Sequence, residues 1–288
     1  MSGYPAPRGA KFPVTVSFHC SPVVRRRHGK VRKLRILLRM RQLRTLVALA
    51  AVLGLSGAAT GQPAVPPGLE GVRALLKAAQ FPEAAEAARA WAADRPDDLR
   101  AAFYLGLALH KSKRHGEAVL LLERASGASA RDFPEAAHAP HYLGWCRYYL
   151  GDLAGARSAF ERHAGSFPDY DDTQYALGLI AYEEDRLPEA ESRFRRALSI
   201  LSAGDAAVNA KERAKNQARL GDVLLRRDRL AEAEGCYREA VRLWPTHGEA
   251  WSKLARVLDR QGRAAEADAA RAEQARIRER SQTAEGAP

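Results

Sequence analysis

The sequence predicts an all-α protein, a solenoid of about six helical hairpins. Three observations predict this fold class: one residue spacing recurs along most of the chain, a short polar turn lies at the same place in each copy, and strand patterns are nearly absent. Repetition at a period of about 34 residues is typical of arrays in which each hairpin contacts only its neighbours.

The recurring spacing places a small residue twelve positions before an alanine, usually with a large residue four positions after that alanine. The copies are Val72/Ala84/Ala88, Gly106/Ala118/Leu122, Gly144/Ala156/Phe160, Gly178/Ala190/Phe194, Gly221/Ala233/Tyr237 and Ala255/Ala267. Small side chains let two helices approach closely, so we expect the first residue on one helix of a hairpin and the alanine on the other. We expect the large residue to fill the gap toward the next hairpin.

A short polar turn separates the two helices of each pair. From the second pair onward the turns are Lys113–Gly116, Gly151–Asp152, Glu184–Arg186, Arg227–Arg229 and Gln261–Arg263. Proline follows the second helix at Pro96, Pro168 and Pro245, where it ends one helix and precedes the next. The last helix, expected over Ala264–Arg280, is polar and suits the end of a stack.

The alanines of successive copies are separated by 34, 38, 34, 43 and 34 residues. The two longer steps predict insertions around Ser126–Pro134 and Ser202–Ala210, because extra residues in an array fall in loops. Pro134 indicates a new helix start after the first insertion, although Pro140 leaves the first helical residue open.

The N-terminal part of the chain has the layout of a secretory signal. Met40–Arg44 is positively charged, Thr45–Leu55 is apolar, and Ser56–Ala59 offers small residues for cleavage after Ala59. We therefore expect a periplasmic or secreted protein. The alternative is a membrane anchor formed by residues 45–59, although a membrane span needs about twenty apolar residues.

These patterns divide the chain into five segments. We interpret residues 1–39 as a disordered basic extension upstream of a true start at Met40, with an organellar transit peptide as the alternative. Residues 40–59 form the signal peptide or N-terminal hydrophobic segment, and residues 60–67 form a linker. Residues 68–280 form the repeat domain, and residues 281–288 a disordered tail.

The net charge of +12 belongs to the N-terminal segments. Twelve of the 46 lysine and arginine residues precede Glu70, the first acidic residue, which leaves 34 basic against 34 acidic residues in the repeats. Nucleic-acid binding needs a basic face. The sequence therefore predicts no nucleic-acid partner, and a membrane partner only through an uncleaved hydrophobic segment.

The repeats resemble the tetratricopeptide repeat family. The first helix of four copies carries a Leu-Gly pair, the second carries Ala and a large residue four positions later, and proline follows. The resemblance covers roughly residues 66–280. It implies a right-handed superhelix whose first helices line a concave groove that takes a peptide or a partner's helix.

Sequence motifs for catalysis or cofactor binding are absent, so we predict a protein that is not an enzyme and has no cofactor. His138 and His141 have metal-ligand spacing but no third ligand pattern, and we interpret both as solvent-exposed. Asp169, Asp171 and Asp172 are expected to form the turn and N-cap of the next helix. Two of the three cysteines, Cys146 and Cys236, lie in the repeats. Because their copies are not adjacent, they should not form a disulfide.

The predicted function is a non-enzymatic scaffold for protein–protein interaction, exported to the cell envelope and binding a protein or peptide partner in its groove. The alternatives are a membrane-tethered or organellar scaffold, and an enzyme using His138, His141 and Tyr148. The resemblance places in the groove Phe103, Leu107, His110, His141, Trp145, Tyr148, Tyr149, Tyr175, Leu179, Tyr182, Asp222, Arg226, Arg256 and Arg260. From these we predict as partner-binding residues Phe103, His141, Trp145, Tyr148, Tyr149, Tyr175, Tyr182, Arg256 and Arg260. Tyrosine and tryptophan give a large contact area with little side-chain entropy to lose.

Overall fold

The computed structural model describes residues 68–128, 132–204 and 208–285, within a compact unit that begins at Pro67. The described residues form twelve α-helices and one short 3₁₀ helix, without a strand. In chain order, hairpins 1 to 6 are α2 (Leu69–Lys77) with α3 (Phe81–Asp94), α4 (Leu99–Lys111) with α5 (His115–Ala125), α6 (Ala139–Tyr149) with α7 (Leu153–Ser166), α8 (Asp171–Glu183) with α9 (Leu187–Ser202), α10 (Ala210–Arg226) with α11 (Leu230–Leu243), and α12 (Gly248–Arg260) with α13 (Ala264–Glu285). The expected all-α array of six hairpins is confirmed.

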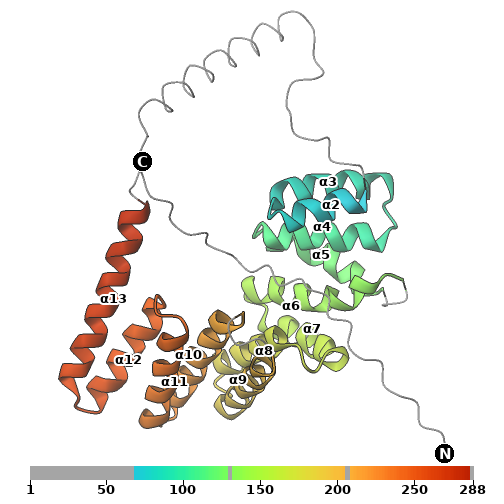
Figure 1. Ribbon diagram of the computed structural model, residues 1–288. Coiled ribbons are helices and arrows are strands. Elements are labelled where there is room, and N and C mark those ends of the chain that lie inside the picture. The colour runs from blue at the N-terminus through green and yellow to red at the C-terminus, as the bar shows by residue number, and fades with distance from the viewer. Residues whose placement is uncertain (1–67, 129–131, 205–207, 286–288) are drawn as a thin grey trace, which may run out of the picture. The chain divides into compact units, whose positions relative to one another are not determined.

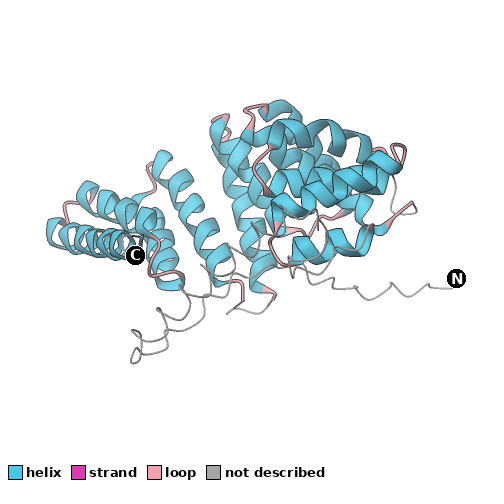
Figure 2. Cartoon of the chain, turned by 90° about the horizontal axis from the view of Figure 1, so that it is seen from above, coloured by secondary structure: helices cyan, strands magenta, loops and turns pink. Residues whose placement is uncertain are grey.

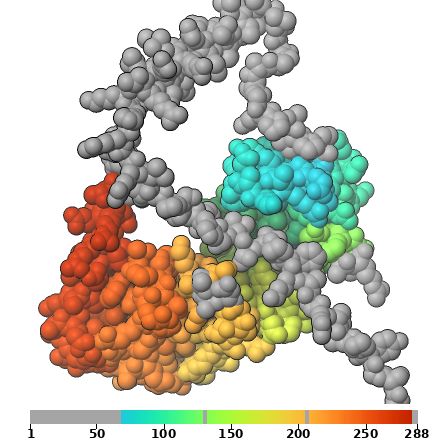
Figure 3. Space-filling model, viewed as in Figure 1, coloured from blue at the N-terminus to red at the C-terminus, as the bar shows by residue number. Residues whose placement is uncertain are grey.

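Successive hairpins pack side by side in chain order, as the colours of Figures 1 and 3 show. Figure 2 shows the helices of this unit from above. Contacts between hairpins involve almost only sequence neighbours. This is the pattern of a solenoid, in which each repeat is stabilised by the next.

The recurring small residues lie where the two helices of a hairpin touch. A Cβ atom added to Gly144 or Gly178 would come within 2.8 Å of the ring of Phe160 or Phe194 in the same hairpin. Gly106 meets Leu122, and Gly221 meets Tyr237, at the same distance. The large residue therefore packs on the glycine of its own hairpin. Phe160 also shares a buried cluster with Ala176, Leu177 and Ile180 of the next hairpin, as the spacing predicted.

Each turn inside a hairpin places one residue in the left-handed backbone region, two positions after the first helix ends. These residues are Ala79, Lys113, Gly151, Asp185, Asp228 and Gly262, with φ between 58° and 81°. The next residue donates its backbone N–H to a carbonyl five positions earlier, as Arg114 does to Leu109 at 2.9 Å. This is the Schellman arrangement, which satisfies carbonyls at a helix end.

The insertions join neighbouring hairpins in two ways. In the first, Phe133 is buried against Phe103 and the 3₁₀ helix η1 (Pro134–His138) continues directly into α6. Across the second, Glu191 on α9 is buried and binds Arg229 at 2.8 Å and also Arg227, both from the turn of hairpin 5. The last helix, α13, continues to Glu285, beyond the expected end at Arg280.

The expected basic extension, signal segment and linker lie outside the described residues. Among the described helices, none has both the length and the apolar character needed to cross a membrane.

Candidate functional site

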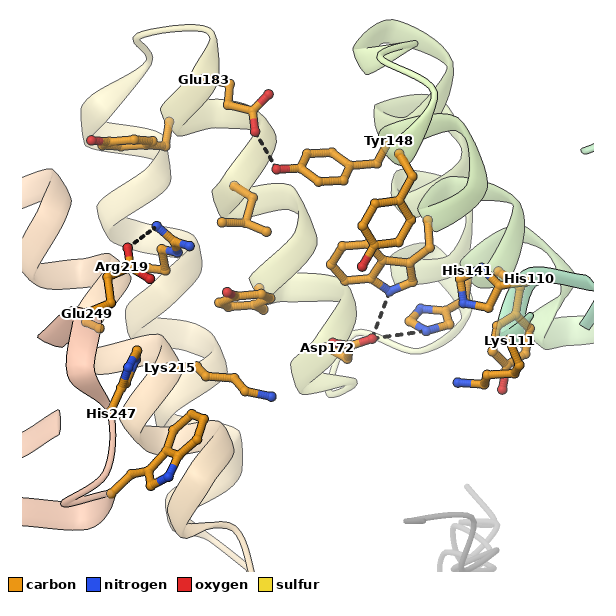
Figure 4. Close-up of a pocket in the computed structure, with 18 residues that line it drawn as sticks. His110, Lys111, His141, Tyr148, Asp172, Glu183, Lys215, Arg219, His247 and Glu249 are labelled. Carbon is orange, nitrogen blue, oxygen red and sulfur yellow. Dashed lines mark hydrogen bonds and ion pairs between the residues drawn. The ribbon is translucent and has the colours of Figure 1, made fainter. Parts of the chain in front are cut away.

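The first helices of hairpins 2 to 5 surround a hollow of about 720 Å³. Helices α4, α6, α8 and α10 each contribute side chains, and the connection from α11 into α12 contributes the rest (Figure 4). The lining residues are His110, Lys111, His141, Tyr142, Trp145, Tyr148, Tyr149, Asp172, Tyr175, Leu179, Tyr182, Glu183, Lys215, Ala218, Arg219, Trp244, His247 and Glu249.

Aromatic side chains from α6 and α8 form one wall of the hollow. The ring of Trp145 stacks on Tyr149 with centroids 5.7 Å apart, and Tyr148 meets Trp145 edge-on at 5.6 Å. Tyr149 is 59% exposed, so its ring presents surface to solvent beside Trp145. On α8, the Tyr182 ring lies under the guanidinium of Arg226 at 4.9 Å. The wall thus offers aromatic surface held in place by neighbouring rings and charges.

Asp172 orients this wall from the first turn of α8. Its carboxylate accepts a hydrogen bond from Trp145 Nε1 at 2.9 Å and lies 3.2 Å from His141 Nε2 (Figure 4). Enclosure by its neighbours pushes the pKa of Asp172 up, but hydrogen bonds from His141 and Trp145 outweigh that effect and leave the pKa below its usual value. Asp172 is therefore ionised at neutral pH and fixes the indole ring.

Behind the wall, a chain of histidines joins hairpins 3 and 4. His138 Nδ1 lies 3.1 Å from His163 Nε2, and His163 Nδ1 lies 2.8 Å from Thr173 Oγ1. Thr173 Oγ1 lies 3.0 Å from His141 Nδ1, whose ring ends the chain at Asp172. With neutral histidines, His138 donates to His163, His163 to Thr173 and Thr173 to His141. His141 then donates to the Asp172 carboxylate, which can only accept, so every contact in the chain is satisfied. Burial lowers the pKa of His163 to about 3, which agrees with a neutral ring.

The opposite wall carries charge from hairpins 5 and 6. Arg219 on α10 pairs with Asp222 at 3.1 Å and lies 3.6 Å from Glu249. Lys215 has its nearest carboxylate, Glu212, at 4.0 Å and projects into the hollow (Figure 4). His247 lies beside Trp244, with ring centroids 4.7 Å apart.

The structure brings together six of the nine residues predicted to bind a partner: His141, Trp145, Tyr148, Tyr149, Tyr175 and Tyr182 all line the hollow. The other three do not. Phe103 is 2% exposed and packs against Phe133, so its placement in the groove was wrong. Arg256 and Arg260 are exposed outside the hollow, and Arg260 pairs with Asp228 of the preceding turn at 2.6 Å.

Three other sequence interpretations are also corrected. His138 and His141 are not solvent-exposed: His138 is half-buried and His141 is buried in the histidine chain. Asp222, placed in the groove, is 4% exposed and accepts from Tyr237 and Lys253 beneath it. Tyr170, rather than an aspartate, is the N-cap residue of α8, and Asp171 and Asp172 occupy its first turn.

Several lining residues were missed by sequence reasoning. One of them is Asp172, which lies three positions before Tyr175 on the helix face already predicted to carry Tyr175, Leu179 and Tyr182. Extending that face by one turn toward the N-terminus would have found it. Trp244 and His247 lie in the connection between hairpins 5 and 6, where a helical stripe gives no signal. Cys146 and Cys236 have free thiols, as expected.

Comparisons with known proteins agree with this architecture. Profiles described as tetratricopeptide repeat match residues 69–137, 143–206 and 214–257, together more than half of the chain. No curated protein sequence gives a significant match.

Solved structures share the fold at low identity. The Cut9–Hcn1 hetero-tetramer of APC/C superposes with a TM-score of 0.60 and 17% identity over 70% of this chain and only 38% of that one. MamA matches with a TM-score of 0.52 and 14% identity over 62% of this chain and 97% of its own. YrrB, described as a TPR protein with an unusual peptide-binding site, gives 0.51 and 16% over 67% and 93%. The repeat profiles and the hairpin array together show that this chain belongs to the tetratricopeptide repeat family.

Proposed function

We propose that this protein is a non-enzymatic scaffold that binds a peptide segment or helix of a partner protein in the hollow. The aromatic wall is the main support for this proposal. An exposed ring such as Tyr149, next to Trp145 and Tyr182, is typical of surfaces that bind other proteins. Repeat arrays of this family present concave surfaces suited to protein–protein interaction.

The two sides of the hollow suit different parts of a peptide. The aromatic wall of α6 and α8 offers contact area for apolar side chains. Lys111 and Lys215 offer ammonium groups to backbone carbonyls or acidic side chains. The same volume lies within the range of small-ligand pockets, but it opens along several repeats, which favours an extended occupant.

A scaffold explains the polar groups better than an enzyme does. His141 between Asp172 and Thr173 resembles a base that activates a hydroxyl. The Thr173 side chain, however, is fully buried and already shared by two histidines. A substrate therefore has no path to that hydroxyl, and the arrangement serves to join hairpins 3 and 4.

Peptide selection tests the site. Peptides selected from a random library on the immobilised protein should bind in the hollow, and Tyr149→Ala and Tyr182→Ala should each weaken that binding by about 2 kcal/mol or more. Binding is measured by fluorescence anisotropy with a labelled peptide. The matched control is Leu120→Ala, which removes a 69% exposed apolar side chain on α5, outside the hollow. Unchanged affinity in both tyrosine variants would place the binding surface elsewhere.

We also propose export to the cell envelope, on the signal-like layout of residues 40–59. N-terminal sequencing of the protein purified from its native host should begin near Thr60 or Gln62. Intact protein beginning at Met1 or Met40 would contradict cleavage and favour the membrane-anchored alternative.

A further inference from the structure

Three metal-ligating side chains from three helices converge beside the hollow. His110 lies near the end of α4, His115 is the first residue of α5, and Cys146 lies in α6. One ligand atom from each lies within 4.8 Å of the others, and Cys146 Sγ lies 3.4 Å from His110 Nδ1. The cluster was not apparent in the sequence, because its members are separated by a turn and an insertion.

The surroundings of the cluster leave one polar atom unsatisfied. His115 Nδ1 is shielded from solvent and has no hydrogen-bond partner among the described residues. A buried polar atom without a partner carries a cost in free energy and calls for an explanation. The ring of His115 stacks on Tyr149 with centroids 4.6 Å apart, which holds the imidazole over the cluster.

We propose that His110, His115 and Cys146 bind a borderline transition-metal ion, with Zn²⁺ as the fitting species. Two imidazoles and one thiolate form a donor set that zinc accepts, and water or a partner side chain can complete four-coordination. Tetrahedral zinc places such atoms about 3.3–3.7 Å apart, so the His110–Cys146 pair already fits and a small rotation of His115 closes the set. A coordinated dication deprotonates the thiol that binds it.

The position of this site gives it a structural consequence. The ion would join α4 and α5 of hairpin 2 to α6 of hairpin 3, across the insertion at residues 126–134. Tyr149, which stacks on His115, and His110 both line one end of the hollow. Metal binding would therefore fix that end of the hollow, whether or not the hollow binds a peptide.

Cobalt substitution tests the site in the full chain without an affinity tag. Chelator-treated, reduced protein is titrated with Co²⁺, and we expect one equivalent to produce thiolate-to-cobalt absorption that Zn²⁺ removes. Zn²⁺ should also raise the melting temperature, because a ligand that binds only the folded state stabilises it. A folded wild-type protein without the thiolate absorption would overturn the proposal. A protein that binds Cu⁺ but neither Co²⁺ nor Zn²⁺ would also overturn it, because the proposed site takes a borderline ion.

Variants assign the ligands. Cys146→Ser and Cys146→Ala should abolish the thiolate absorption, and His110→Gln and His115→Gln should abolish one-to-one binding. Circular dichroism establishes which variants fold. Cys236→Ser and His247→Gln remove the same residue types outside the cluster and should retain binding. Full absorption in a folded Cys146 variant, or its loss in Cys236→Ser, would contradict the assignment.

Discussion

At the scale of single residues, the absence of a methyl group decides how closely the two helices of a hairpin approach. Gly106, Gly144, Gly178 and Gly221 each leave room for a large side chain sixteen positions later, and a Cβ atom would come within 2.8 Å of that side chain. Contacts this short force a neighbour to move. The conserved geometry across four hairpins therefore depends on glycine at these places, although glycine weakens a helix elsewhere.

Substitution of these glycines should have opposite effects at packed and open positions. Gly178→Ala should lower the free energy of unfolding by about 1–3 kcal/mol, because the added methyl group overlaps the Phe194 ring. Gly235→Ala, within α11 and with open space around it, should raise it by about 0.5–1 kcal/mol. Urea unfolding measures both values. A similar change in the two variants would show that the helix contact is not tight.

At the scale of helices and turns, all six hairpins reverse direction through one residue with left-handed backbone conformation at the equivalent position of the turn. Only Gly151 and Gly262 are glycines, whereas Lys113 and Asp185 accept the same conformation with a side chain. A left-handed residue other than glycine costs roughly 1–2 kcal/mol. The Schellman hydrogen bonds of each turn offset this cost.

Two substitutions at the left-handed positions, one that introduces glycine and one that removes it, test whether backbone strain is present in these turns. Lys113→Gly should stabilise the protein by about 0.5–1 kcal/mol, because it removes backbone strain. Gly151→Ala should destabilise it by about 1 kcal/mol, since no atom lies near the new methyl group and only the positive φ opposes it. Urea unfolding again gives the measurement, and changes of the same sign would refute the strain argument.

The hairpins and their turns could be predicted from the sequence because the spacing of small residues and polar turns is local. The packing of Phe160 on Gly144 of its own hairpin could not, since the spacing does not fix how far each helix rotates about its axis. Phe103 was predicted to line the groove, but it is buried because Phe133 of the first insertion packs against its ring. The His110–His115–Cys146 cluster requires three helices to meet, which no local pattern reveals.

At the scale of the whole repeat unit, the buried apolar residues divide into three clusters, and only the smallest of them joins hairpins 3 and 4. One large cluster of buried residues runs from α2 to Ala159 in α7, and another from the end of α8 to α13. Between them lies a small cluster around Phe160, Leu177 and Ile180. The histidine chain occupies this junction, so a polar network replaces part of the apolar packing. Such a junction depends on the protonation state of its members.

Acid should therefore weaken the unit at this junction. Burial, followed by the nearby His141 and His138, lowers the pKa of His163 to about 3, below the value of 6.5 for an exposed histidine. The unfolded chain then binds more protons than the folded chain between these values, so stability is full above about pH 6.5 and falls as the pH decreases toward 3. His163 alone should remove about 2 kcal/mol between pH 7 and pH 5.

The variant that isolates this effect is His163→Leu, which removes the titrating ring. Its free energy of unfolding should be lower than that of the wild type at pH 7, because Thr173 and His138 lose a partner. It should fall less steeply as the pH decreases to 5. Gly235→Ala removes no titrating group and should keep the wild-type slope. Parallel slopes in the wild type and His163→Leu, measured by urea unfolding at both pH values, would show that His163 titrates normally and that the junction between hairpins 3 and 4 does not sense acid through it.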